Sequence, residues 1–259
     1  MQRRLKNAMD NRRFFEQADL RRKVHPREGC RKMALELKEP GWGRDKVEQL
    51  LLNNGYRVQY ARNYSKTTQS QHSYVCPNLI AGLELNNIHQ VVQTDITYYR
   101  IGERFYYLTF FIDVYSRYIG GYAVSETLEA TANMNALKML LRNRNYDHSK
   151  LIHHSDKGRQ YIAKAYLHLL EQHHIKMSMC DQAWENAYTE RINRTIKEEY
   201  LNSWKIENYQ QLKSCTAKAI KHYNEKRIHQ SLNWRTPKAY ESFISNLPAD
   251  KRPVMKLYK

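Results

Sequence analysis

The hydrophobic pattern of the chain changes its period near residue 91, and this change constrains the fold more than any other feature. Before it, apolar residues recur at three- and four-residue spacing, which predicts short helices. From there, VVQTDITYY and then RFYYLTFFIDVYSRYIGGYAV predict three strands, and helical and strand patterns alternate afterwards. Grouped strands followed by alternation predict an α/β domain with a mixed sheet and helices on its faces.

The same spacing locates the individual elements. In the amino-terminal part, helices are expected over residues 1–24, 30–37 and around 47–51, with a short basic helix at 56–66. In the later part, helices are expected at 127–141, 162–173 and 185–201, and strands at 151–154 and 175–179. Residues 67–82 are polar and rich in turn formers, which is typical of a linker.

Charge is concentrated at the two ends of the chain. The net charge is +17. Residues 1–70 hold 17 Lys and Arg against 8 Asp and Glu, residues 71–181 hold 11 against 10, and residues 182–259 hold 15 against 8. This distribution suits two basic surfaces that grip a polyanion around a nearly neutral core. A solvated basic face remains an alternative for either end alone.

The amino-terminal helices and the basic charge together suggest a helix-turn-helix-like DNA-binding region over residues 1–66. A small helical bundle with a basic surface is equally compatible with these residues. The four cysteines form no C-x-x-C pair, so neither a zinc site nor a disulfide framework is indicated. No apolar run is long enough to cross a bilayer, and no secretory signal begins the chain. We therefore expect no membrane partner and an intracellular, reduced protein.

Three acids occupy positions where chemistry is plausible. Asp95 interrupts a β-rich segment, which breaks local propensity as functional residues often do. Asp156 follows a short strand in HHSDKGRQY, where Ser, Asp and Gly are also ordinary turn formers, so a simple turn stays open. In the helix expected at 185–201, Glu190 lies opposite the apolar stripe formed by Tyr188, Ile192, Ile196 and Tyr200. Asn193, Arg194 and Lys197 share this polar side with Glu190.

Carboxylates from a strand, a strand end and a helix could converge to hold two Mg²⁺ ions, because Mg²⁺ prefers oxygen ligands. Two such ions can activate an attacking oxygen and stabilise a leaving one at phosphorus. Each acid taken singly is better explained as a surface ion pair or a cap, and only the combination of the three points to a metal site. Asp113 is also strand-borne, and we interpret it as structural.

Residues 91–245 resemble the catalytic core of the DDE transposase and retroviral-integrase superfamily, most closely bacterial insertion-sequence transposases of the IS-three group. The motifs that carry this resemblance are QTDITY, FIDVYSRYIGGYAV, HSDKGRQY, ENAYTERINRTIKEEYL and HYNEKRIHQSLNWRTPKAYE. The resemblance implies an RNase H-like fold, with a mixed five-stranded sheet flanked by helices. It implies the domain order 1–66 helical region, 67–90 linker, 91–245 core with carboxy-terminal helices, and 246–259 basic tail.

The resemblance also assigns roles. Asp95, Asp156 and Glu190 match the family's catalytic, metal-binding triad, and Lys197 matches its accompanying basic residue. The further DNA contacts expected from the matched segments are Arg194, Asn193, Arg227, His229, Arg44, Arg57 and Arg62. For Arg227 and His229, a hydrogen-bond network at the edge of the core is an equally good interpretation. The interval between Asp156 and Glu190 is two residues shorter than usual, and Glu185 stands where many members have Asp.

The implied function is a DNA transposase that cuts at the ends of its element and joins the freed 3′-OH to target DNA. It implies two Mg²⁺ ions, with Mn²⁺ able to substitute, and double-stranded DNA as partner, both terminal repeats and target. It further implies at least a homodimer on DNA and a bacterial, cytoplasmic, nucleoid-associated protein. Members of this group often obtain their terminal-sequence specificity from an upstream reading frame fused by frameshifting. Two alternatives are an inactive transposase-derived DNA-binding protein and an RNase H-type nuclease that cuts without joining.

Overall fold

The structure, a computed structural model, describes residues 2–38, 40–58, 76–142, 148–180 and 182–258. These residues form two compact units. The helical unit comprises the described residues up to 58 together with 198–205, and the sheet unit comprises residues 76–197 and 206–258. No helix in the described ranges is both long enough and apolar enough to span a bilayer.

The helical unit contains the three amino-terminal helices that the apolar spacing predicts. They are α1 (Gln2–Val24), α2 (Cys30–Glu36) and α3 (Arg44–Asn53). Each helix contributes a fully buried side chain to one small core, namely Phe14, Met33 and Leu51. The fourth helix expected over 56–66 is not seen at residues 56–58, and the rest of that segment lies outside the described residues.

The turn after α1 is tied down by polar contacts within the helical unit. Glu28, only 1% exposed, accepts two hydrogen bonds from the guanidinium of Arg21, at 2.5 and 2.8 Å. A bidentate pair of this kind is among the stronger polar contacts in proteins. His25 Nδ1 lies 3.0 Å from the hydroxyl of the buried Tyr200, which belongs to the same unit. These contacts fasten the segment between α1 and α2 to the rest of the helical unit.

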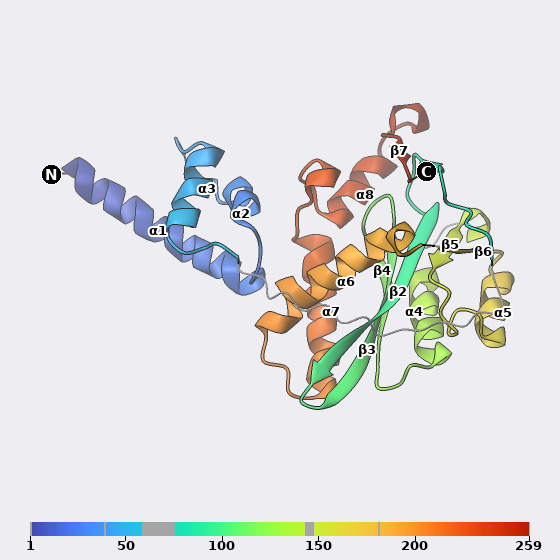
Figure 1. Cartoon of the computed structure of the whole chain (residues 1–259). Coiled ribbons are helices and arrows are strands. Elements are labelled where there is room, and N and C mark those ends of the chain that lie inside the picture. Colours follow the sequence, from blue (N-terminus) through green and yellow to red (C-terminus); the bar gives the residue numbers. More distant parts are fainter. Residues whose placement is uncertain (1, 39, 59–75, 143–147, 181, 259) are drawn as a thin grey trace. The chain divides into compact units, whose positions relative to one another are not determined.

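The sheet unit is built on a five-stranded mixed sheet (Figure 1). Its strands are β2 (Val91–Ile101), β3 (Arg104–Asp113), β4 (Ile119–Ser125), β5 (Ile152–Ser155) and β6 (Lys176–Met179). The spatial order is β4-β3-β2-β5-β6, with antiparallel pairs among the first three strands and parallel pairs at β2–β5 and β5–β6. This is the RNase H-like arrangement that the sequence predicts.

Helices cover the sheet as the alternating pattern requires. The remaining helices are α4 (Ala130–Arg142), α5 (Lys164–Gln172), α6 (Ala187–Glu199), α7 (Tyr209–Glu225) and α8 (Pro237–Ser245). The short 3₁₀ helices are η1 (His148–Lys150), η2 (Ala183–Asn186), η3 (Leu201–Ser203), η4 (Gln230–Leu232) and η5 (Ala249–Lys251). Apolar residues of α4 and α5, among them Leu137 and Leu170, form the main core with Val92 and Phe111 of the sheet.

The close packing of α4 on the sheet depends on a glycine. At Gly121 in β4, an added Cβ would lie 2.2 Å from the carbonyl oxygen of Ala136 and 3.1 Å from Leu140 Cβ. Only a residue without a side chain permits this approach of strand to helix.

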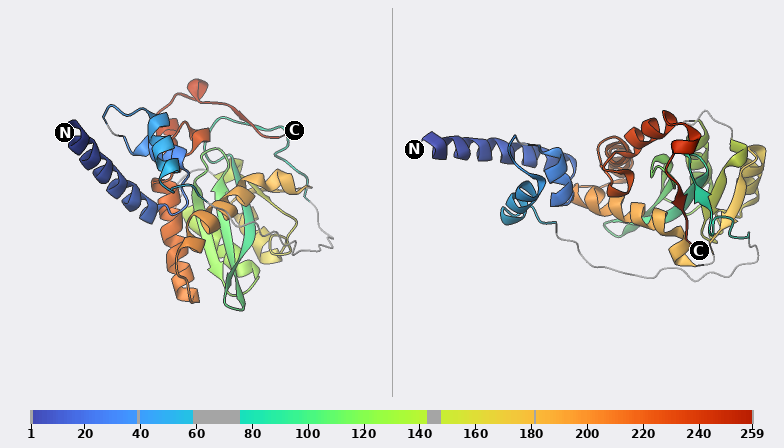
Figure 2. Two further views of the ribbon diagram at one scale, coloured as in Figure 1. Left: turned by 60° about the vertical axis from the view of Figure 1, so that its left-hand side comes forward. Right: turned by 90° about the horizontal axis from the view of Figure 1, so that it is seen from above.

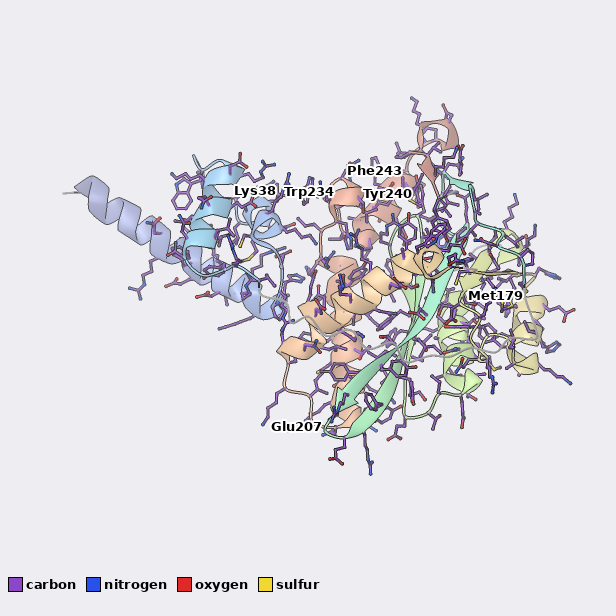
Figure 3. All side chains as sticks on the ribbon, viewed as in Figure 1. Lys38, Met179, Glu207, Trp234, Tyr240 and Phe243 are labelled. Atoms are coloured by element: carbon purple, nitrogen blue, oxygen red, sulfur yellow. The ribbon has the colours of Figure 1, made fainter. Side chains whose placement is uncertain are left out.

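The carboxy-terminal helices use the sequence features that start helices. Asn208 accepts a hydrogen bond from the Gln211 backbone at the start of α7, and Thr236 caps α8 just before its Pro237. Tyr240 and Phe243 lie on α8 (Figure 3). Tyr240 is buried in a second core that also contains Val91 and Leu257.

A two-stranded sheet changes the predicted boundaries. β1 (Glu84–Leu85) pairs antiparallel with β7 (Met255–Lys256). Leu85 and Leu257, from segments expected to be a linker and a tail, are both buried in the second core. The segments at 84–85 and 255–257 are therefore part of the sheet unit. Strands of two residues leave no periodic pattern, so this pairing could not be predicted from the sequence.

Candidate active site

The first candidate acid, Asp95, lies on the face of β2 opposite the α4–α5 core. Successive side chains in a strand point to opposite faces. Val92 and Ile96 pack on the α4–α5 core, so Gln93, Asp95 and Thr97 face the other side. Asp95 is half-buried there.

Helix α6 lies along that face of β2 and matches its spacing. The amide of Asn193 donates to Asp95 Oδ2 at 2.8 Å, and Lys197 Nζ donates to Thr97 Oγ1 at 2.7 Å. Four residues along an α-helix rise about 6 Å, and two residues along a strand rise about 6.6 Å. The distance from Asn193 to Lys197 along α6 therefore matches the distance from Asp95 to Thr97 along β2. Figure 1 and Figure 2 show α6 crossing β2.

This contact changes the predicted orientation of α6. The sequence placed Asn193 with Glu190 on a polar side facing away from the packing stripe. The structure buries Asn193 to 5% exposure and also buries Thr189, while Glu190 and Arg194 remain exposed. The buried side of α6 is wider than its apolar stripe, because some of its polar residues pack on polar residues of β2.

Asp156 is brought to the same end of the sheet by the parallel pairing of β2 and β5. In that register Gln93 stands opposite His154, so Asp95 and Asp156 each follow the paired positions by two residues. The turn expected from Ser, Asp and Gly is also present, since Gly158 N donates a hydrogen bond to Asp156 Oδ1 at 3.1 Å. Asp156 is exposed and directly follows the carboxyl end of β5.

Glu190 sits in the first turn of α6, which η2 anchors to the sheet. Gln93 Nε2 donates to the Glu185 carbonyl at 2.9 Å, and Asn186 Nδ2 donates to the Thr94 carbonyl at 3.1 Å. The carboxylate of Glu185 accepts from Gln182 N at 3.0 Å and completes a capping box. Glu185 thus has the structural role at the helix start that its position predicts.

The three acids interact electrostatically. Burial, and then the negative charges of Asp156 and Glu190, raise the pKa of Asp95 to about 7. A hydrogen bond from Ile96 N and the charge of Lys197 act in the opposite direction. Desolvation also raises the pKa of Glu190, against the effect of Arg194 one turn along the helix. Because like charges raise a carboxyl pKa only at close range, Asp95 lies within electrostatic range of Asp156 and Glu190.

Such a cluster fits a hard divalent cation better than a set of structural ion pairs. Oxygen ligands of this kind suit Mg²⁺. Within the described residues, no three Asp, Glu, His or Cys side chains are already grouped tightly enough to hold an ion. Binding would therefore draw the carboxylates together.

The other residues predicted to contact DNA lie in varied surroundings. Lys197 and Arg194 are on α6 near the acids, as described above. Arg227 is 8% exposed, and its guanidinium lies 3.2 Å from Nε2 of His229. The two residues therefore form a polar contact at the edge of the core, and their contact with DNA stays a prediction. In the helical unit, Arg44 pairs with Asp45, and Arg57 is exposed. Arg62 lies outside the described residues.

Asp113 has the structural role predicted for it. Its carboxylate accepts hydrogen bonds from His89 N at 2.6 Å and Ser116 N at 2.7 Å, and the side chain is 2% exposed. It therefore fixes the connections at one end of β3 and takes no part in the acid cluster.

Two residues near the acids had no sequence-based prediction. Trp184 lies in η2 and is 51% exposed. Tyr258 contacts the Trp184 ring and donates to the Glu185 carbonyl. Trp184 could have been suspected from its place just before Glu190, whereas the position of Tyr258 follows from the unforeseen β1–β7 pairing.

The sheet unit has the RNase H-like fold of an integrase core, and comparisons with known proteins agree. An integrase core domain model matches residues 86–183, and a second integrase core domain model matches residues 171–237. A chain of the simian T-cell lymphotropic virus intasome is similar over 86% of this chain and 74% of its own, with a TM-score of 0.50 at 14% identity. That likeness concerns the fold alone.

Sequence relatives specify the family. The insertion element IS600 31 kDa protein of Shigella sonnei is 33% identical over 228 residues, 85% of this chain and 84% of the relative. The transposase for IS629 of Shigella sonnei is 33% identical over 165 residues, 61% of this chain and 54% of the relative. The InsF transposase for IS3A of Escherichia coli is 26% identical over 201 residues, 76% of this chain and 69% of the relative. The chain belongs to the DDE transposase and integrase superfamily and is of the IS3 type.

Proposed function

We propose that this transposase cuts DNA at the ends of its mobile element and transfers the freed 3′-OH into target DNA. The observation that carries the proposal is geometric: Asp95 and Asp156 each follow the paired positions of β2 and β5 by two residues, and the Asn193–Asp95 hydrogen bond ties α6, which carries Glu190, to the same strand. This arrangement supports a cluster of three carboxylates, which suits metal-dependent phosphoryl transfer. The cluster argues against a relic that uses the fold only as a scaffold.

Asp95, Asp156 and Glu190 would hold divalent cations, with two Mg²⁺ ions as the expected set and Mn²⁺ as a substitute. When bound, such ions activate the attacking oxygen and stabilise the leaving oxygen. The chain's own residues prepare this site. Asn193 fixes the orientation of the Asp95 carboxylate through its 2.8 Å hydrogen bond. Lys197, held against Thr97, places a positive charge beside the acids for a DNA phosphate.

Double-stranded DNA is the proposed partner, both as terminal repeats and as target. Lys197, Arg194 and Asn193 lie nearest the acids, and Arg227 and His229 form a second set in the sheet unit. Arg44, Arg57 and Arg62 would serve in the helical unit. Because two element ends must be cut and joined together, we expect at least a dimer on DNA. The setting would be the bacterial nucleoid.

The test uses the full chain and duplex DNA that carries the inverted repeats flanking its gene. With Mg²⁺, gels should show strands cut at the repeat ends and products joined to a target plasmid. Glu190→Gln should bind the same DNA and give neither product. Cutting without joining would favour the RNase H-type nuclease, and activity in a chelator would exclude the metal mechanism.

A further inference from the structure

Trp184 is a large aromatic side chain displayed at the edge of the candidate active site. It is 51% exposed, although aromatic side chains of this size are mostly buried on average. It belongs to η2, the 3₁₀ helix that leads into α6 and Glu190. An exposed tryptophan in such a place calls for a ligand or a purely structural reason.

The position of Trp184 relative to the acids is fixed by its neighbours in the chain. Glu185 and Asn186, the next two residues, are hydrogen-bonded to Gln93 and Thr94 of β2. Asp95 is the next residue of that strand. The 3₁₀ helix that contains Trp184 is therefore attached to β2 immediately before the first candidate acid.

Tyr258 holds the indole from one side. The two ring centroids are 5.2 Å apart and the planes meet at 82°, which is a favourable edge-to-face geometry. Tyr258 is itself anchored, since its hydroxyl donates to the Glu185 carbonyl and lies 3.4 Å from Gln93 Nε2. The indole is thus supported in a defined orientation while about half of it remains in solvent.

We propose that Trp184 is a stacking platform for an unpaired DNA base next to the scissile phosphate. This inference rests on the proposed function, because the acids direct the DNA backbone to this edge. Every base has a π-face, so stacking on an aromatic side chain binds bases with little sequence preference. A base within a duplex has both faces covered by its neighbours, so the platform would select a frayed or extruded base.

The chain supplies a matched control. Phe105 is 54% exposed and also lies in the sheet unit, at the start of β3. Its partner in the sheet is Arg100, whereas Asp95 pairs with Phe110. Phe105 is therefore five strand residues, or about 17 Å, from the position opposite Asp95. It matches Trp184 in exposure and aromatic character but not in proximity to the acids.

The experiment compares the full-length wild type with Trp184→Ala, Trp184→Phe and Phe105→Ala. The probes are a fully paired duplex and the same duplex with its last three base pairs mismatched at one end, in low salt with Ca²⁺. Fluorescence anisotropy gives both dissociation constants. The wild type should prefer the frayed probe by about five-fold or more, the lower range for stacking on an aromatic residue.

Trp184→Ala should lose this preference while binding the paired duplex as well as the wild type does. Trp184→Phe should keep part of the preference for the frayed probe, and Phe105→Ala should keep all of it. A 2-aminopurine at the frayed position should be quenched by the wild type and not by Trp184→Ala. Equal binding of both probes by the wild type, or a preference that survives in Trp184→Ala, would overturn the platform and leave the proposed function standing. Failure to bind either probe would overturn both.

Discussion

Asn193 on α6 donates a hydrogen bond of 2.8 Å to Oδ2 of Asp95 on β2. The side-chain amide is almost fully buried, and it joins the helix that carries Glu190 to the strand that carries the first acid. It therefore aligns the two elements and favours the ionised form of Asp95, because a donor stabilises a carboxylate more than a carboxylic acid.

Replacing Asn193 should shift the pH dependence of the reaction. In Asn193→Ala the Asp95 carboxylate loses a donor, so its pKa rises above about 7. A hydrogen bond to a charged group contributes about 1.5–3 kcal/mol, which corresponds to roughly 1–2 pH units. The rising limb of the cleavage rate should move to higher pH by about that amount. A lower rate with an unchanged pH profile would show that Asn193 only supports the fold.

Metal binding should strengthen as pH rises through 7. Below that pH, Asp95 is protonated in the metal-free protein and the proton must leave before a cation binds. The raised pKa means that the metal-free fold gains stability from this group at low pH and loses it as pH rises through about 7. We therefore expect Mg²⁺ to raise the melting temperature more at pH 8 than at pH 6.

The control for this prediction is Asp95→Asn, which removes the titrating carboxylate. It should melt at a similar or higher temperature than the wild type in a chelator at pH 8, and Mg²⁺ should add little. An equal effect of Mg²⁺ at both pH values in the wild type would contradict the assigned pKa.

Two glutamates near the start of α6 should behave differently. Glu190→Gln should fold and bind DNA but lose cleavage by orders of magnitude, since a metal ligand is removed. Glu185→Gln retains an acceptor for Gln182 N and should cost on the order of 0.5–1 kcal/mol of stability. Its activity should be largely kept. The reverse outcome, with Glu185→Gln inactive and Glu190→Gln active, would mean that the shortened loop has moved the catalytic acid.

Gly121→Ala should destabilise the sheet unit by about 2–3 kcal/mol, as overpacking of a rigid contact does. The new Cβ would meet the backbone of α4 at Ala136, which cannot move without lifting the helix. Chemical denaturation measures the loss. Gly43→Ala, at a position with negative φ and no atom within 4 Å of the added carbon, should lower stability by less than 1 kcal/mol.

The elements that could be predicted from the sequence are those with a repeated local pattern. Val47 and Leu51, or Leu137 and Leu141, recur at helical spacing and are buried on helices where expected. Asp113, at the end of β3, has the structural role that we assigned to it. The resemblance supplied Asp95, Asp156 and Glu190 as the candidate acids, and their catalytic role stays a prediction.

What could not be predicted depends on contacts between distant segments. The burial of Asn193 requires the polar face of β2, and no property of the helix alone indicates it. The pairing of Glu84–Leu85 with Met255–Lys256 involves too few residues to leave a period. Tyr258 reaches Glu185 only through that pairing. Periodicity describes each element by itself, so it cannot show which elements meet.

The parallel pairing of β2 with β5 has a consequence for how the site arises during folding. β2, β3 and β4 can pair in sequence through short connections, and none of these steps brings Asp156 near Asp95. Asp156 comes near Asp95 only when β5, which follows β4 and α4 in the chain, pairs with β2. Contacts between segments so distant in the chain close slowly, because the entropy of the long loop opposes them. A partly folded chain would therefore hold its acids apart, and the proposed active site would assemble only when the chain reaches its native topology.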